Sequence, residues 1–382
     1  MLHLGTTLLF ATFTACSAAL PQAPDSPERT DGCKCFPGDD CWPSLCDWDK
    51  LNQTVKGRLV ATVPLASPCY PSSEWDNYGN DTCSDLQNGW LKPAIHIDTS
   101  HSAMAPFFAN QSILHHLLAT CPLCNADTSP GCDPFRVGEL PCVVGTYVQY
   151  AIDVATPEHA QAGLAFADEH NIRLVIRNTG HDYNGKSTGA GALGLWMHHL
   201  KDIEVIDYED AHYSGKALHM GAGVEGLEAY VAADAAGLHV VGGTCPSVGL
   251  TGGYSQGGGH SPLSSYHGLG ADQILEFEVV TAEGEHLICN REQNTDLYWA
   301  MSGGGGGTFA VAMSTKYKAH PDVPFSGMTL NYQTTNLSSL DAHYEAVEYL
   351  QSMVPSLTAR SISVVWYFEV SNDTLMPSQA PH

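Results

Sequence analysis

The sequence predicts an α+β protein in which two units of alternating strands and helices follow a cysteine-rich N-terminal region. The pattern over 147–176 predicts a strand, a helix and a strand, and the pattern over 216–241 predicts the same order. Ten of the 13 cysteines lie within 33–142, ahead of both units. A chain of 382 residues with 43% hydrophobic content can bury at least one full core, and its length predicts two domains.

The first unit starts with the alternating stretch "YVQYAIDVA" at 147–155. The next segment, "TPEHAQAGLAFADEHN", predicts a helix with Thr156 as N-cap, Pro157 at the first helical position and an apolar face. The buried strand "IRLVI" follows and leads directly into the polar stretch "RNTGHDYNGKST" at 177–188. The sequence therefore places a histidine in a turn at the end of a strand.

The second unit predicts a strand in "KALHMGAG", a helix in "VEGLEAYVAADAAG" with Gly237 as its C-cap, and a short strand in "LHVV". Farther along, "ILEFEVVTAEGEHLICN" predicts a hairpin with Glu283 and Gly284 at the turn. A short helix is expected to begin at Thr295. The pattern then changes at "EAVEYLQSMV" and "SISVVWYFEV", which look like the start of another domain.

The N-terminus has the pattern of a secretory signal. An apolar run from Leu4 to about Ala15 precedes Ser17, Ala18 and Ala19, and it is shorter than the ~20 residues that a membrane-spanning helix needs. We expect a signal peptide at 1–19, a cysteine-rich region at 20–143, a cofactor domain at 144–322 and the start of a truncated substrate domain at 323–382. The protein is therefore predicted to be secreted.

Cysteine usage agrees with an oxidising compartment. The ten cysteines before residue 143 allow up to five disulfides, whose pairing the sequence leaves open. The alternative is a zinc site at Cys121 and Cys124, but no histidine pair follows at ligand spacing. Sequons at Asn52, Asn80, Asn110, Asn336 and Asn372 fit a glycoprotein. His198 and His199 lack ligand spacing with carboxylates, so no metal is predicted.

The net charge is −25. Phosphate backbones and anionic membrane surfaces repel such a charge, so we expect neither nucleic acid nor, once the signal is removed, membrane as a partner.

A glycine-dense stretch occupies 242–272, "GGTCPSVGLTGGYSQGGGHSPLSSYHGLGAD". It lacks the G-x-G-x-x-G spacing between a strand and a helix, which argues against a Rossmann phosphate loop. Its alternative is a flexible linker, but residues such as Cys245, Tyr254 and His260 interrupt the glycines. Bare backbone amides suit close contact with a pyrophosphate or a ring system. We therefore favour a structured, ligand-facing loop.

Four motifs in order carry a resemblance to a known family: "RNTGHDYNGKSTG", the glycine-dense stretch, "NTDLYWAMSGGGGGTFAV" and the early "CKCFPGDDCWPS". Over about residues 30–370 the chain resembles FAD-linked oxidases of the vanillyl-alcohol oxidase type. It is more closely similar to the berberine bridge enzyme-like branch of fungi, which includes isoamyl-alcohol oxidases and oxidoreductases of secondary-metabolite clusters. The resemblance implies an FAD-binding domain of two α/β subdomains.

The resemblance also implies covalent attachment of FAD, by the histidine of "GHD" at the 8-methyl group and by the cysteine of "GxCPxVG" at ring position 6. These residues are His181 and Cys245 here. Cofactor-binding residues carried over from the motifs are His181, Cys245, Arg177, Asn178, Thr179, Gly180, Asp182, Gly243, Thr244, Gly249, Gly252, Gly253, Gly258, His260, Gly270 and Asp272. The residues alone leave two alternatives, an ordinary loop histidine at 181 and a disulfide between Cys245 and Cys289. A buried free thiol is the expected state of Cys289.

The implied activity is hydride transfer from an alcohol or amine-bearing carbon of a small molecule to FAD, with dioxygen as acceptor. Sugar oxidation and oxidative cyclisation of the ergot-alkaloid type use the same attachment and remain alternatives. The segment that supplies catalytic bases in the family is mostly missing from this sequence. No catalytic base is therefore assigned, and an inactive, truncated flavin-binding remnant is the competing hypothesis.

Overall fold

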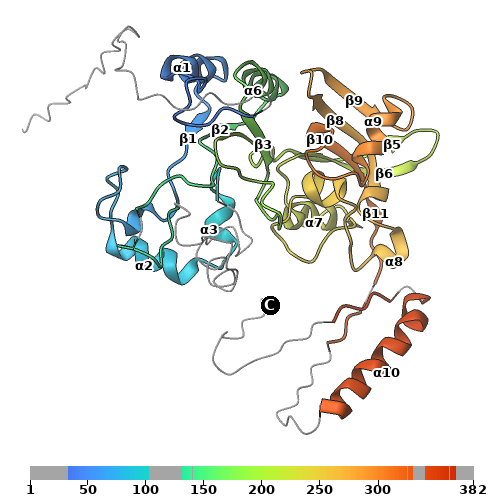
Figure 1. The fold of residues 1–382 in the computed structure, drawn as a ribbon. Helices are drawn as coiled ribbons and strands as arrows, with labels where there is room; N and C mark the ends of the chain where they lie inside the picture. The colour runs from blue at the N-terminus through green and yellow to red at the C-terminus, as the bar shows by residue number, and fades with distance from the viewer. Residues whose placement is uncertain are drawn as a thin grey trace, which may run out of the picture.

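The computed structural model describes residues 33–102, 131–139, 141–324, 326–329, 340–360 and 362–366. The predicted signal peptide and the Cys121–Cys124 pair lie outside these residues, as do three of the sequons. Within them, two larger sheets form side-by-side halves of the molecule (Figure 1). Of the N-terminal region, helix α1 (Leu45–Thr54) lies above the first sheet in this view, and the segment with α2 (Asn80–Gly89) and α3 (Ala94–Ile97) lies below it.

The first sheet has four strands in the order β1-β2-β4-β3. Strands β2 (Tyr150–Asp153), β3 (Arg173–Arg177) and β4 (Ala192–Trp196) run parallel, and β1 (Leu59–Ala61) is antiparallel to β2. Helix α6 (Pro157–Glu169) connects β2 with β3. Its N-cap is Thr156 and proline occupies its first turn, as predicted, because the fixed φ of proline suits that position.

The second sheet is antiparallel, with five strands in the order β5-β6-β10-β8-β9. Their bounds are β5 Ile203–Glu209, β6 Ser214–Gly221, β8 Ile274–Thr281, β9 His286–Asn290 and β10 Ala310–Lys318. The predicted β8–β9 hairpin is confirmed. Gly284 sits at its turn with φ +81°, a conformation that glycine adopts without steric cost. Helix α9 (Thr295–Met301) begins at the predicted threonine.

The second strand–helix–strand unit is confirmed, and it differs from expectation only at the end of its helix. Helix α7 (Gly226–Asp234) ends before Gly237, which has φ +68° and donates its N–H to the Asp234 carbonyl in the turn that follows. The next strand, β7 (Leu238–His239), does not join the five-stranded sheet. It pairs instead with β11 (His320–Pro321), which follows directly after β10 in the chain. The segment after α7 is therefore held at the C-terminal end of β10.

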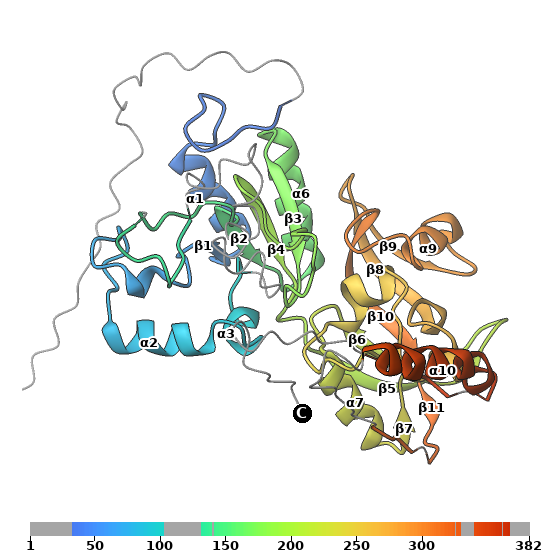
Figure 2. The same cartoon turned by 60° about the horizontal axis from the view of Figure 1, so that its bottom comes forward.

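One apolar core joins the two sheets. Its side chains come from α1 (Leu45–Thr54), from α6 and the first sheet, and also from β8 and β10, where Val280, Val311 and Met313 are buried. Gln161 of α6 donates a hydrogen bond of 2.7 Å to the carbonyl of Gly284 in the β8–β9 turn. Figure 2 shows α6 beside the strands of the first sheet, on the side that is nearer to β8. The two halves are therefore held in a fixed relation, with the polar loops between them.

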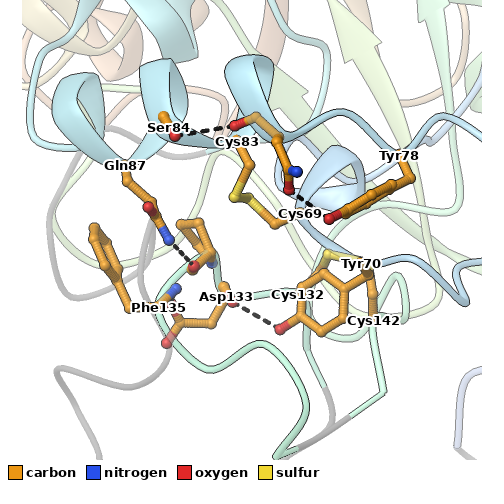
Figure 3. Close-up of a disulfide and its surroundings, with 12 residues drawn as sticks. Cys69, Tyr70, Tyr78, Cys83, Ser84, Gln87, Cys132, Asp133, Phe135 and Cys142 are labelled. Carbon is orange, nitrogen blue, oxygen red and sulfur yellow. Dashed lines mark hydrogen bonds between the residues drawn. A yellow bond between two sulfur atoms is a disulfide. The ribbon is translucent and has the colours of Figure 1, made fainter.

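Disulfides tie the N-terminal region, as predicted. Three pairs lie within the described residues, Cys35–Cys41, Cys69–Cys83 and Cys132–Cys142, and Cys46 is also disulfide-bonded. Cys33 is an exposed free thiol, so not all ten of these cysteines pair. The second pair links the turn at Ser67–Cys69 to α2 (Asn80–Gly89), beside the third pair (Figure 3). The Tyr70 hydroxyl donates to the Asp133 carbonyl at 2.7 Å, which fixes the two disulfide-bonded segments together.

The remaining helices are short α3 (Ala94–Ile97) and α8 (Ser264–His267), and α10 (Leu340–Thr358), which Figure 1 shows outside the two sheets. Tyr344 and Tyr349 of α10 are exposed, at 64% and 70%. In the described part of the chain, no helix combines the length and the apolar character needed to cross a membrane.

Candidate functional site

The turn after β3 is built over the side chain of Arg177. This arginine is 1% exposed, and its Nη2 donates to the carbonyls of His96 at 2.9 Å and Thr179 at 3.3 Å. Gly180 has φ +87°, and a Cβ on it would lie 2.4 Å from Nη1 of Arg177. Only glycine lets the backbone pass this close to the guanidinium, so the turn that presents His181 depends on it.

Arg177 also carries unused hydrogen-bonding capacity. Its Nε and Nη1 are buried and have no hydrogen-bond partner among the described residues. Burial lowers the pKa of Arg177 to about 9, which reflects the cost of holding this cation away from water. A buried guanidinium with free N–H donors suits an anionic or carbonyl-bearing ligand.

Asn178 links this turn to the second half of the molecule. Its Nδ2 donates to the Ala222 carbonyl at 2.7 Å, just beyond the end of β6. A Cβ on Gly249 would lie 1.8 Å from the same nitrogen, so glycine is required there for the two loops to meet. The Oδ1 of Asn178 and the Oγ1 of Thr251, both buried, have no hydrogen-bond partner in the described chain. These atoms add free polar groups to the junction.

The structure brings His181 and Cys245 together. The Sγ of Cys245 lies 3.8 Å from Nε2 of His181, and the hydroxyl of Ser247 lies 2.9 Å from that nitrogen and 3.7 Å from the sulfur. Burial, and next the charge of Arg177, lower the pKa of His181 to about 4, so its imidazole is neutral at pH 7. A neutral imidazole and a thiol side by side are two potential nucleophiles.

Cys245 is a free thiol, so the alternative disulfide with Cys289 is wrong. Cys289 is fully buried in β9 and also free, as expected, and burial raises its pKa to about 12. Its thiol therefore stays protonated and takes no part in the site.

Two tyrosines hold the segment that leads to Cys245. The Tyr230 hydroxyl donates to the Gly243 carbonyl at 2.6 Å, and the Tyr317 hydroxyl donates to the Val241 carbonyl at 2.7 Å. A Cβ on Gly242 would lie 2.1 Å from the Tyr230 oxygen, so the loop packs directly on this ring. Thr244, beside the cysteine, is exposed.

The rest of the glycine-dense stretch folds around Tyr254, which lies in the single π-helical turn Leu250–Tyr254. The Tyr254 hydroxyl donates to the His260 carbonyl at 2.9 Å, while the His260 side chain itself is exposed. A Cβ on Gly270 would lie 2.6 Å from the ring, and a Cβ on Gly243 would contact its opposite edge at 3.5 Å. Tyr254 thus connects this turn with the Cys245 loop.

Several predicted site residues have local structural contacts in this arrangement. Asp272 is exposed and its Oδ2 accepts from the Leu269 N–H at 2.8 Å, and the Gly258 carbonyl accepts from the Ala271 N–H at 2.9 Å. Asp182 accepts from the backbone N–H groups of Asn184 and Lys186, which closes the loop after His181. These three residues shape loops: Asp182 the loop directly after His181, and Gly258 and Asp272 the end of the glycine-dense stretch.

The run of glycines at 303–307 packs against the same region. A Cβ on Gly306 would lie 2.7 Å from the Cα of Gly253. A Cβ on Gly253 would have no neighbour within 4 Å, and one on Gly252 would meet only the Nδ2 of Asn178, at 4.0 Å. Gln256 fixes the run, because its carbonyl accepts from the Gly305 N–H at 2.7 Å and its Oε1 from the Gly307 N–H at 3.2 Å. The Lys186 ammonium donates to the Gly306 carbonyl at 3.3 Å. The loop after His181 therefore reaches this run.

A pocket of about 440 Å³ opens there, between β3 on one side and β8 and β10 on the other. Its size is within the range of small-molecule and cofactor sites. Its walls are mostly apolar, with Arg173, Lys186 and the buried hydroxyl of Thr188, whose Oγ1 has no partner among the described residues. The apolar lining includes Leu164, Leu174, Val175, Ile176, Val280, Phe309 and Val311.

Sequence reasoning did not identify Ser247, Tyr230, Tyr254 or this pocket. Ser247 lies two positions after Cys245, and a hydroxyl so close to the predicted cysteine is the sequence feature that could have identified it. The contacts of the tyrosines join segments that are distant in sequence, so no spacing reveals them. Within the described ranges, no cluster of three or more His, Cys, Asp or Glu side chains is arranged to hold a metal ion.

Comparison with known proteins gives a consistent result. Residues 148–290 match the family described as FAD binding domain. The chain is 48% identical to the FAD-linked oxidoreductase ZEB1 of Gibberella zeae, over 87% of this chain and 55% of that protein. It is also 48% identical to the FAD-linked oxidoreductase sthB of Phaeosphaeria nodorum, over 65% of this chain and 79% of that protein.

A solved structure, that of the VAO-type flavoprotein MtVAO615 from Myceliophthora thermophila C1, has a TM-score of 0.68 and 46% identity over 75% of this chain and 49% of its own. The chain spans about half the length of the first curated relatives that it matches. The FAD-binding family covers the turn after β3 and the Cys245 loop, which are the two parts of the site.

Proposed function

Because this chain belongs to the FAD-linked oxidoreductases of the vanillyl-alcohol oxidase type, we propose that it oxidises a small molecule by hydride transfer to bound FAD. The observation that carries the proposal is the junction of His181 and Cys245 between two sheets that share one core. When bound, FAD accepts a hydride from an alcohol or amine-bearing carbon and passes two electrons to dioxygen, which gives hydrogen peroxide.

The side chains present fit this cofactor. An FAD molecule needs donors for its pyrophosphate, an apolar slot for its adenine and close approach of backbone to its ring system. The free N–H donors of Arg177, the bare backbone at Gly252 and Gly253, and the pocket bordered by Lys186 and Thr188 meet these needs. We propose that these residues hold the cofactor, with its nucleotide half in the pocket.

His181 and Cys245 are proposed to bind the flavin ring covalently. The imidazole nitrogen replaces one hydrogen of the 8-methyl group, and the sulfur replaces the hydrogen on ring carbon 6. Forming each bond removes one hydrogen from the flavin carbon and one from the nitrogen or the sulfur. This amounts to two protons and two electrons for each bond. Dioxygen takes them up and becomes hydrogen peroxide. The neutral state of His181 and the free thiol of Cys245 support this proposal.

The predicted turn residues Thr179, Gly180 and Asp182, and the loop residues Gly243, Thr244, Gly249, Gly258, His260, Gly270 and Asp272, are proposed to shape the cofactor site. Of these, Gly180 and Gly249 act by permitting close backbone approach to Arg177 and Asn178. The contacts of His260, Gly258 and Asp272 favour a supporting role around Tyr254.

The proposed substrate is a small alcohol or a fungal secondary metabolite, and no side chain is proposed as the catalytic base. Secretion is proposed as well. The three described disulfides support it, because such bonds persist in oxidising compartments. A carbohydrate oxidase and an oxidative cyclase remain within the proposed enzyme class.

The test is expression in a secreting host followed by denaturing electrophoresis. Flavin fluorescence is expected to stay with the protein band, and hydrogen peroxide is expected when the chain is incubated with a panel of primary and benzylic alcohols. Fluorescence without peroxide on any substrate would favour a flavin-binding remnant. Absence of flavin from both the native and the denatured chain would refute the proposed cofactor role.

A further inference from the structure

The hydroxyl of Ser247 is the one polar group seen in contact with both proposed attachment side chains among the described residues. It lies 2.9 Å from Nε2 of His181 and 3.7 Å from Sγ of Cys245. A serine hydroxyl has one hydrogen to donate and two lone pairs to accept with. Its single hydrogen can therefore serve only one of these two neighbours.

The direction of these two hydrogen bonds decides whether a ring nitrogen of His181 keeps a lone pair that can form a bond. If the serine donates to Nε2, the proton of the neutral imidazole is on Nδ1, and neither ring nitrogen has a free lone pair. If Nε2–H donates to the serine oxygen, Nδ1 keeps its lone pair and the serine hydrogen is available to the sulfur. Only the second arrangement leaves both His181 and Cys245 able to form a bond.

We propose that Ser247 is a positioning residue for both attachments: its oxygen accepts from Nε2–H of His181, and its hydroxyl donates to the sulfur of Cys245. This inference rests on the covalent attachment proposed above. The bond then forms at Nδ1, and the proton that the imidazole loses is the one on Nε2, which leaves through the serine oxygen.

The groups around this contact agree with the proposal. Burial, followed by the charge of Arg177, lowers the pKa of His181 and keeps its ring neutral. The Tyr230 hydroxyl donates to the carbonyl of Gly243, two positions before Cys245. Among the described residues, no carboxylate contributes to the shift of the His181 pKa. The hydroxyl of Ser247 and its backbone, which also hydrogen-bonds the ring and opposes the lowering of its pKa, are thus the uncharged partners that favour one tautomer of this ring.

The experiment compares wild type with Ser247→Ala, Ser247→Thr and the control Ser214→Ala, whose serine is exposed at the start of β6. Peptide mass spectrometry measures the fraction of His181 and of Cys245 linked to flavin after a fixed expression time. We expect about a tenfold loss at His181 and a loss at Cys245 in Ser247→Ala, with FAD still bound non-covalently, and recovery in Ser247→Thr. Full linkage at both residues in Ser247→Ala would overturn the proposal.

A second measurement does not depend on the cofactor chemistry. Nitrogen NMR of ¹⁵N-histidine-labelled protein, in the Cys245→Ala variant produced without FAD in a riboflavin-starved host, reports which nitrogen of His181 carries the proton. The Nε2–H tautomer is expected, and its population is expected to fall in the additional Ser247→Ala variant. A Nδ1–H tautomer would overturn the role of Ser247. If wild type has no covalent flavin, the proposed attachment fails, and the tautomer still decides the role of the serine.

Discussion

The Sγ of Cys245 lies 3.8 Å from Nε2 of His181, although 64 positions separate the two residues in the chain. Each is presented by a loop whose backbone is fixed by a glycine. Gly180 passes over the guanidinium of Arg177, and Gly249 meets the amide of Asn178. The first loop follows β3 of the first sheet, and the second follows β7, which pairs with β11 directly after β10. The core shared by the first sheet, β8 and β10 helps to set the distance between the loops.

Gly249→Ala is expected to destabilise the folded chain. The added Cβ would lie 1.8 Å from Nδ2 of Asn178, so the two loops must separate, at a cost of about 1–3 kcal/mol in the free energy of unfolding. Urea unfolding measures this change. Gly327→Ala is the control, since a Cβ there has no neighbour within 4 Å. Equal stability of the two variants would show that the loops are not tightly joined.

Arg177→Met is expected to weaken FAD binding more than it affects folding. In the described part of the chain, two nitrogens of the buried Arg177 guanidinium have no hydrogen-bond partner. Removing the guanidinium spares the folded chain the cost of a desolvated cation, but it also removes hydrogen-bond donors that would bind the ligand. In a background of His181→Ala and Cys245→Ala, fluorescence quenching is expected to show at least about a tenfold rise in Kd for FAD. An unchanged Kd would place the pyrophosphate away from Arg177.

Ala282→Trp is expected to block the pocket between the sheets. Ala282 lies at its rim and is exposed, so a large side chain there can fill the pocket without disturbing the core. FAD affinity is expected to fall, whereas Tm of the cofactor-free chain stays near that of wild type. Ala282→Ser is the matched control. Normal affinity with tryptophan at this rim would exclude the pocket as the nucleotide site.

Acid is expected to destabilise the junction of β7, α8 and β11. His239 pairs with His320 across β7 and β11, and His267 stacks on His320 with ring centroids 3.8 Å apart. Burial, followed by the charges of His267, His239 and Lys318, lowers the pKa of His320 to about 4 from an ordinary 6.5. Since the unfolded chain binds a proton that the folded chain does not, stability is expected to fall between pH 6.5 and 4.

Thermal unfolding across that pH range measures this effect. His320→Gln removes the titrating ring and is expected to give a smaller loss of Tm on acidification, because glutamine carries no proton to gain. An equally steep loss in His320→Gln would assign the acid sensitivity to other buried histidines, such as His181 and His198, whose pKa values are also lowered to about 4.

Local sequence patterns predicted much of this fold. Thr156 and Pro157 start a helix, Gly284 lies at a hairpin turn and Thr295 begins a helix, because each depends on a few neighbouring residues. The pairing of β7 with β11 could not be predicted, since its partners are 81 positions apart in the chain. For the same reason the sequence missed Tyr230 and Ser247, whose contacts depend on how separate loops approach.

The most direct test of the central claim is mass spectrometry of proteolytic peptides from the intact, secreted protein. The account predicts that one flavin links two peptides, through the imidazole of His181 and the sulfur of Cys245. Single variants at either residue are expected to keep one bond each, and the double variant none. Unmodified His181 together with Cys245 as a free thiol or in a disulfide, in protein that still contains FAD, would contradict it.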